Sequence, residues 1–148
     1  MKQDRIWRHL ILSLAGAIAL YAIGFAWIEH LRTRLGPWEV TFIQQPGGLP
    51  QLLINHAKLG IEDVSIQLPA TTTSSPTNAA IQFLPGTEVP FDVPFGKCVF
   101  LDPIFLPGTV TLEIGGHLIE MMPRQLTVDT NHYRWEPGLA VVIEKIEE

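Results

Sequence analysis

Residues Val110–Met121 read VTLEIGGHLIEM, and this stretch decides the fold of the larger part of the chain. Glycine tolerates the positive φ angles of a tight hairpin, so Gly115-Gly116 predicts a two-residue turn between antiparallel strands. A shift by one residue would break the apolar face of the hairpin, so the register is specified. The facing pairs are then Leu112 with Ile119, Val110 with Met121 and Thr111 with Glu120.

A second hairpin follows in the sequence. A turn at Thr130-Asn131 would place apolar residues opposite one another on one face. The facing pairs in that register are Val128 with Tyr133, Leu126 with Trp135 and Asp129 with His132. Two hairpins with matching apolar faces predict an antiparallel sheet.

Short runs of Val, Ile, Thr and Phe, separated by Gly, Pro and Asn, continue through the sequence after Trp38. This pattern predicts an all-β extracytoplasmic domain, an antiparallel sandwich or barrel-like fold. A polar loop is expected over Ala70–Asn78. The expected strands are Trp38–Gln44, Gln51–Asn55, Val64–Leu68, Ala80–Leu84, Val89–Phe95, Cys98–Leu101, Thr109–Ile114, His117–Met122, Gln125–Asp129, His132–Trp135 and Ala140–Glu144. Prolines 90 and 94 place Val89–Phe95 at a sheet edge.

The segment Leu10–Ile28 reads LILSLAGAIALYAIGFAWI and carries no charge. As a helix it would span roughly 28 Å, about the hydrocarbon core of a bilayer. A cleaved signal peptide is the alternative, but the run is long and closes on bulky Trp27 and Ile28. We therefore expect one N-terminal transmembrane α-helix. The expected organisation is a cytoplasmic tail at 1–9, a transmembrane helix at 10–28, a linker at 29–37 and a β-domain at 38–148.

Basic residues set the expected orientation of this helix. Lys2, Arg5, Arg8 and the amino terminus precede it, whereas Arg32 and Arg34 follow it. By the positive-inside rule, this small excess favours a cytoplasmic N-terminus and a periplasmic or otherwise extracytoplasmic C-terminal domain. The expected location is the inner (cytoplasmic) membrane.

The region after the helix is acidic. From Gly36 onward there are five Lys and Arg against thirteen Asp and Glu, a net charge of −8. This balance argues against nucleic acid as a partner and against docking on anionic lipid headgroups. Cys98 is the single cysteine, which excludes an intrachain disulfide. It lies in an apolar run, so we expect a buried, unreactive thiol.

The pentapeptide FLPGT occurs at Phe83–Thr87 and again at Phe105–Thr109, 22 residues later. Leu-Pro-Gly suits a type II turn, because proline fixes φ at the second position and glycine accepts positive φ at the third. No third copy follows, so a solenoid repeat is disfavoured. We expect one turn type used twice; a duplicated structural unit is the alternative.

The sequence carries few candidates for chemistry. Asp129 and His132 could form an acid–imidazole pair, but such a pair beside a turn is usually a surface contact. His117, next to the Gly-Gly turn, is expected to be a polar hairpin-tip residue. Phosphate-loop, nucleophile-elbow and Cys-x-x-Cys motifs are absent from the sequence. We therefore expect a protein that is not an enzyme and has no metal or cofactor.

Two sets of residues are candidates for binding partners. The first is a stripe of small residues on one helix face, suited to close packing of membrane helices: Ala15, Ala19, Ala22 and Ala26. The second is an apolar cluster in a proline-rich stretch: Phe91, Phe95, Phe105 and Leu106. These four could instead belong to the core, or touch the bilayer.

These features favour a non-catalytic accessory subunit of a membrane complex, whose partners are other membrane proteins, or a second copy, together with the lipid bilayer. The alternative is a membrane-tethered periplasmic binding module for a lipid, glycan or peptide. That alternative expects a groove lined by the aromatic cluster.

Overall fold

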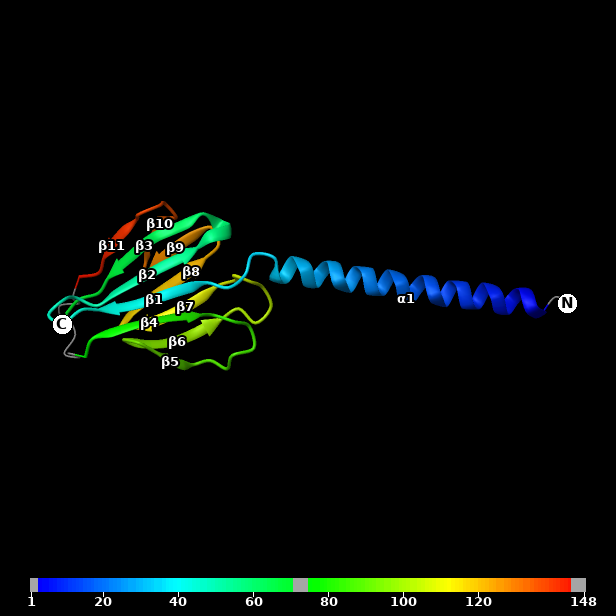
Figure 1. The fold of residues 1–148 in the computed structure, drawn as a ribbon, viewed down its shortest axis with the longest axis horizontal. Helices are drawn as coiled ribbons and strands as arrows, with labels where there is room; N and C mark the ends of the chain where they lie inside the picture. The colour runs from blue at the N-terminus through cyan, green and yellow to red at the C-terminus, as the bar shows by residue number, and fades with distance from the viewer. Residues whose placement is uncertain (1–2, 71–74, 145–148) are drawn as a thin grey trace. The chain divides into compact units, whose positions relative to one another are not determined.

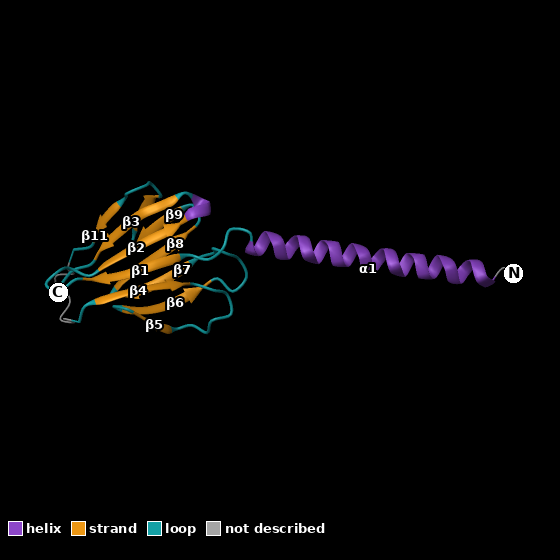
Figure 2. Ribbon diagram, in the orientation of Figure 1, coloured by secondary structure: helices purple, strands orange, loops and turns teal. Residues whose placement is uncertain are grey.

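The computed structural model describes residues 3–70 and 75–144 of the chain. Part of the expected polar loop lies outside the described residues. Two compact units are present, Met1–Arg34 and Leu35–Glu148. Figure 1 traces the chain through both, and Figure 2 separates helix from strand.

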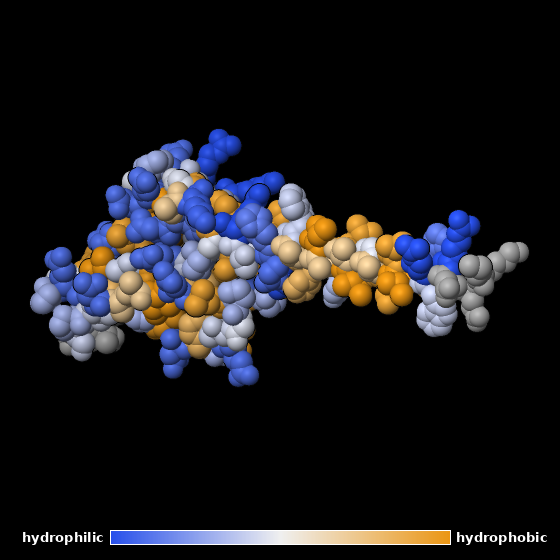
Figure 3. Space-filling view, turned by 45° about the vertical axis from the view of Figure 1, so that its right-hand side comes forward, coloured by the Kyte–Doolittle hydropathy of each residue, from blue (hydrophilic) through white to orange (hydrophobic). Residues whose placement is uncertain are grey.

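The first unit is one helix, α1, from Gln3 to Thr33. It is longer at both ends than the expected span, because polar residues of good helix propensity flank the apolar segment. In the space-filling view apolar residues form a band along the helix, with hydrophilic residues near its N-terminus (Figure 3). Its apolar window is fully exposed, and α1 is long and apolar enough to span a membrane.

The second unit contains two β-sheets. The five-stranded sheet has the order β11-β3-β2-β1-β4 and the six-stranded sheet the order β10-β9-β8-β7-β6-β5. The first comprises β1 (Glu39–Gln44), β2 (Gln51–His56), β3 (Ile61–Gln67), β4 (Thr77–Gln82) and β11 (Ala140–Val142). The second comprises β5 (Phe91–Val93), β6 (Gly96–Leu101), β7 (Val110–Ile114), β8 (His117–Met122), β9 (Gln125–Val128) and β10 (Asn131–Arg134). A short 3₁₀ helix, η1 (Ala57–Leu59), joins β2 to β3.

Each of the eleven expected strands has a counterpart, and the β7–β8 hairpin has the predicted register. Leu112 pairs with Ile119 and Val110 with Met121. The proline-bearing segment forms β5 at the edge of its sheet, as predicted.

The predicted register of the second hairpin is wrong by two residues, because the turn lies one residue earlier than predicted. Tyr133 pairs with Leu126, and Asn131 pairs with Val128, so the turn is Asp129-Thr130. Asp129 takes a φ of 53°, a left-handed conformation that aspartate tolerates better than most residues. The apolar alternation alone allowed both registers, and the backbone freedom of Asp129 fits the observed one.

The expectation of a wholly antiparallel fold is also wrong at one edge. β11 pairs with β3 in parallel, with Val141 opposite Ile66. Along the chain, β4 and all six strands of the second sheet lie between β3 and β11. The chain therefore returns to the first sheet, where β11 is an edge strand.

Residues from both sheets share one core, which makes the domain a β-sandwich. Each sheet contributes the alternate residues of its strands, such as Val40 and Phe42 of β1 and Ile119 and Met121 of β8. The largest buried side chain is that of Trp38, which precedes β1. Such burial stabilises the domain by roughly 1.5–3 kcal/mol for each large apolar side chain.

The two ends of the sandwich differ. We call one end the linker end: there Glu39 at the start of β1 pairs with Gln82 at the end of β4. We call the opposite end, which carries the turns at Gly115-Gly116 and Asp129-Thr130, the far end. Both ends carry candidate sites.

Candidate functional site

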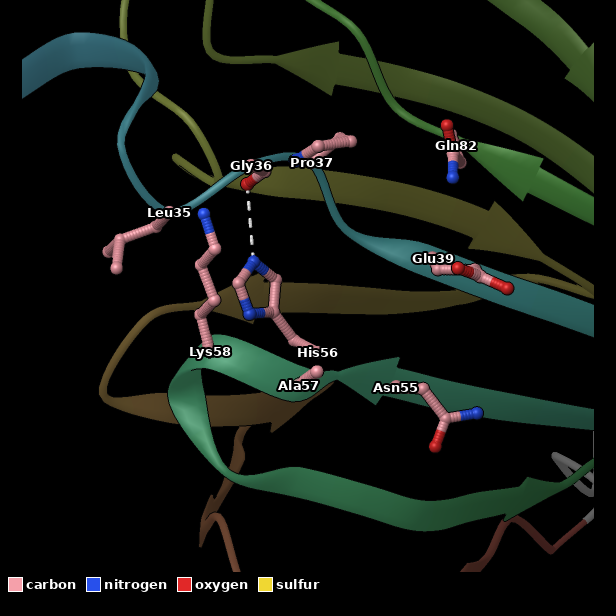
Figure 4. A pocket seen from close by; sticks show the side chains of 9 residues that line it. All are labelled: Leu35, Gly36, Pro37, Glu39, Asn55, His56, Ala57, Lys58 and Gln82. Atoms are coloured by element: carbon pink, nitrogen blue, oxygen red, sulfur yellow. Dashed lines mark hydrogen bonds between the residues drawn. The ribbon is translucent and has the colours of Figure 1, made fainter. Parts of the chain in front are cut away.

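At the linker end, His56 fixes the chain just before β1. Its Nδ1 accepts a hydrogen bond from the Leu59 N–H at 3.2 Å, and its Nε2 lies 3.2 Å from the Gly36 carbonyl oxygen. Since Nδ1 is an acceptor, Nε2 carries the proton and donates to Gly36. A hollow of about 290 Å³ lies beside this contact (Figure 4). Both ring nitrogens are satisfied, so His56 has a structural role here.

The two FLPGT loops lie at this same end, and they differ. Trp38 Nε1 donates to the Gly108 carbonyl oxygen at 2.9 Å, and Asp102 Oδ1 accepts from the Ile104 N–H at 2.8 Å. These contacts hold the second loop. Gly86 and Gly108 both take positive φ, as expected. The chain forms a turn at Pro85-Gly86, whereas the second copy forms only a bend over residues 103–107, so the prediction of one turn type used twice is wrong.

The candidate aromatic cluster is divided between core and surface. The ring of Phe91 lies 6.2 Å from that of Phe83, and the ring of Phe95 lies 6.0 Å from that of Phe42. Both Phe91 and Phe95 are partly buried against the core. Phe105, by contrast, is 52% exposed. Leu106 beside it is half-buried.

Exposed apolar residues gather in the two loops of the linker end. We call this set the apolar rim: Leu84, Val89, Ile104 and Phe105. The loops that carry them follow β4 and β6. The rim is therefore a property of the two FLPGT loops together, since neither copy alone supplies more than two of its members.

At the far end, the structure pairs His117 with Asp129. His117 Nδ1 lies 2.8 Å from Asp129 Oδ2, and Asp129 Oδ1 accepts from the Leu118 N–H at 2.9 Å. The His117 side chain is only 5% exposed, so the expectation of a polar hairpin-tip residue is wrong. The expected pairing of Asp129 with His132 is also wrong, because His132 lies opposite Thr127 and contacts its hydroxyl.

Several opposing effects set the acidity of Asp129. Partial burial raises the pKa of this carboxyl, while the hydrogen bonds from His117 and the Leu118 N–H, and the charge of the imidazole, lower it. The net effect is a pKa below the ordinary value. Asp129 is therefore a carboxylate at neutral pH, able to fix the orientation of the ring.

The sequence patterns did not predict the His117–Asp129 pair, because the pair depends both on the register of β8 with β9 and on the position of the turn after β9. β8 must pair with β9 so that Ile119 faces Val128. The next residue, Asp129, must then turn back toward the start of β8. A sequence signal did exist: aspartate is among the few residues that readily occupy the left-handed turn position found here.

Cys98 behaves as predicted. It is fully buried, and desolvation raises the pKa of its thiol to about 11.

Within residues 3–70 and 75–144, no group of three or more His, Cys, Asp or Glu side chains is placed to hold a metal ion. The expected absence of a metal stays a prediction.

The alanine stripe lies on a continuous helix. Ala15, Ala19, Ala22 and Ala26 all fall within α1 and are exposed. At 100° per residue the four lie within about 60° of one another.

No protein-family model matches the chain, and no curated protein or solved structure matches it significantly.

Proposed function

We propose that the chain is a non-catalytic, single-pass accessory subunit of a membrane protein complex. The observation that carries this proposal is the exposed apolar helix α1 with its narrow face of alanines. Small residues allow helices to approach closely in a bilayer, where van der Waals packing drives association. The alanine stripe packs against a helix of a partner or of a second copy.

The opposite face of α1 carries bulky groups that suit lipid. Leu20, Tyr21 and Phe25 are exposed, and the rings of Tyr21 and Phe25 stack at 6.3 Å. Such side chains keep a neighbouring backbone at a distance, so the two faces of the helix have different neighbours.

The basic residues before the helix favour a cytoplasmic N-terminus in the inner membrane and a periplasmic β-domain. In this arrangement the acidic domain braces partners on the extracytoplasmic side. Arg32 forms an ion pair with Glu29 at 3.2 Å near the C-terminal end of α1.

The apolar rim supplies the β-domain's contact with the partner. Only four residues, Arg34–Pro37, separate the end of α1 from Trp38. Four residues reach at most about 14 Å. A partner that packs against α1 is therefore close enough to contact Phe105 and Leu106. Phe91, whose ring lies 6.2 Å from that of Phe83, supports this surface from the core side. Phe95 does not, because it lies toward the far end, next to Gly96, which pairs with Ile114.

The test is extraction of native membranes in mild detergent, followed by size analysis and identification of the co-migrating proteins. We expect the chain in a defined complex at fixed stoichiometry. Ala19→Leu or Ala22→Leu should move the chain out of the complex without unfolding the β-domain. Ala17→Leu is the matched control, because it makes the same change on the opposite face of α1 and should leave assembly intact.

A second pair of variants tests the rim. Phe105→Ser should weaken assembly, whereas Val142→Ser, at a comparably exposed apolar position away from the rim, should not. If Ala19→Leu, Ala22→Leu and Phe105→Ser all remain fully assembled, neither surface binds a partner. A wild-type chain that migrates as a monomer would contradict the accessory role and favour the tethered binding module.

A further inference from the structure

β4 is the least protected edge strand of the sandwich, and lies beside β1 at the margin of its sheet (Figure 1). Sheet edges present unpaired backbone groups, which proteins usually shield with short strands, prolines or charges. Of the edge strands that the described residues form, β5 and β11 have three residues each, β5 lies between two prolines, and β10 contains His132 and Arg134. β4, by contrast, has six residues, reads TNAAIQ and carries neither a charge nor a proline. This edge is therefore suited to pairing with a further strand.

The backbone groups of β4 that point to this edge follow from its register. β4 pairs with β1 along its whole length without a register shift. Immediately after β4, the Phe83 N–H donates to the Trp38 carbonyl oxygen at 3.1 Å in the same register. Bonded and unbonded pairs alternate along an antiparallel ladder, so Asn78, Ala80 and Gln82 direct their N–H and C=O groups away from β1. Among the described residues, no strand pairs with this side of β4.

The side chains of β4 also leave room for a neighbour. Its core-facing residues Ala79 and Ile81 are only half-buried, whereas Val40 and Phe42, in the same rows on β1, are completely buried. A further strand beyond β4 would cover the exposed flank of these two residues. The edge is therefore incomplete in its packing as well as in its hydrogen bonds.

We propose that this edge pairs with β4 of a second copy of the chain, antiparallel about a two-fold axis at Ala80. In that register Ala80 lies opposite Ala80 of the second copy, and Asn78 lies opposite its Gln82. Every N–H and C=O group that points to the edge is then bonded. The two amide side chains face each other on the outer surface, while Ala79 lies opposite Ile81 on the core side, a small residue beside a large one. β4 is complementary to itself, which selects a second copy as the occupant.

The sequence around β4 also favours this register over the next one. An axis at Ala79 would place Gln82 opposite Pro76, which has no N–H to donate. The axis at Ala80 uses all three outward-pointing residues and excludes the proline. The register of the pairing is therefore specified by the strand itself.

Charge and chain length are compatible with this pairing. The region after the helix has a net charge of −8, but β4 brings no carboxylate to the contact. At about 4.8 Å between strands and 3.3 Å per residue, the two Glu39 residues would lie about 20 Å apart. Each four-residue linker reaches at most about 14 Å, so both copies of α1 can lie in one bilayer. Anchoring in one membrane raises the effective concentration, so a short edge contact suffices.

The experiment is cysteine cross-linking of the full chain in membranes, with Cys98→Ser removing the native thiol. Ala80→Cys should form a disulfide-linked dimer, because the Cα atoms of a bonded pair lie about 5.5 Å apart, within the range of a disulfide. Gln82→Cys is the matched control on the same strand and face, since its two copies would lie about 13 Å apart and should stay unlinked. Co-expressed Asn78→Cys and Gln82→Cys chains should link to each other.

Ala80→Pro tests the backbone bonds. It removes an N–H that β1 does not use, so the domain should keep its thermal transition while the link between Asn78→Cys and Gln82→Cys chains is lost. Survival of that link would overturn the pairing, as would equal linking of Ala80→Cys and Gln82→Cys, which random collision or packing of α1 alone would give. Absence of any link would also overturn it; protection of the outward amides of β4 from hydrogen exchange would then assign the edge to a segment of another protein.

Discussion

Trp38 Nε1 donates a buried hydrogen bond to the carbonyl oxygen of Gly108, 70 residues away, at 2.9 Å. This bond joins the residue before β1 to the second FLPGT loop. Trp38 also lies against His56 and Trp135, with ring centroids 5.3 Å apart in both cases. The linker end of the sandwich is therefore organised around one side chain.

Trp38→Phe should destabilise the β-domain, because it leaves the Gly108 carbonyl buried without its donor. The expected loss in free energy of unfolding is about 1–3 kcal/mol. Trp135→Phe is the matched control: Trp135 Nε1 donates to the Met122 carbonyl at 2.8 Å, but at a half-buried site that water can reach. Chemical denaturation of both variants measures the difference, and an equal loss in both would contradict the special role of Trp38.

The two FLPGT glycines should differ on substitution. Gly86→Ala adds a Cβ with nothing within 4 Å, so only its positive φ opposes the change, at about 1–2 kcal/mol. Gly108→Ala adds the same penalty and places the Cβ 2.5 Å from the Phe105 carbonyl oxygen. We expect Gly108→Ala to cost about 1–3 kcal/mol more, the usual price of overpacking. Thermal or urea unfolding of the pair is the measurement, and equal losses would show that the loops are equivalent.

The Asp129 carboxylate should make stability depend on pH in the acidic range. Its folded-state pKa is lowered, so the unfolded chain takes up the proton more readily. The stabilisation is present above the ordinary carboxyl pKa, roughly pH 4, and is lost as the pH falls through the folded-state value. Asp129→Asn should therefore cost stability at pH 7 and less at pH 3. Asparagine tolerates the positive φ at this position, so the variant isolates the charge. A stability gap of the same size at both pH values would be inconsistent with this linkage.

The Cys98 thiol should be inert in the folded chain. With a pKa of about 11 and no exposed surface, it presents almost no thiolate at pH 8. Labelling with a thiol reagent should occur only as the domain unfolds, at a rate set by opening. The control is Cys98→Ser combined with Leu49→Cys, which moves the single thiol to a position that is 44% exposed and should react at once. Rapid labelling of native Cys98 would show that the site opens.

Local sequence patterns determined much of this architecture. A long uncharged run produced α1, and alternation with turn residues produced the eleven strands. The Gly115-Gly116 hairpin was specified in full, because its turn and its apolar faces allow only one register. Two prolines placed β5 at an edge, since proline lacks the N–H that a central strand must donate.

Tertiary structure decided the features that join distant segments. The parallel pairing of β11 with β3, the division of Phe91 and Phe105 between core and surface, and the pairing of His117 with Asp129 each depend on which strands become neighbours. The two FLPGT copies have identical sequences, yet only the second receives the donor of Trp38. Local periodicity fixes the faces of a strand, whereas the partner of each face is set by packing across the whole sandwich.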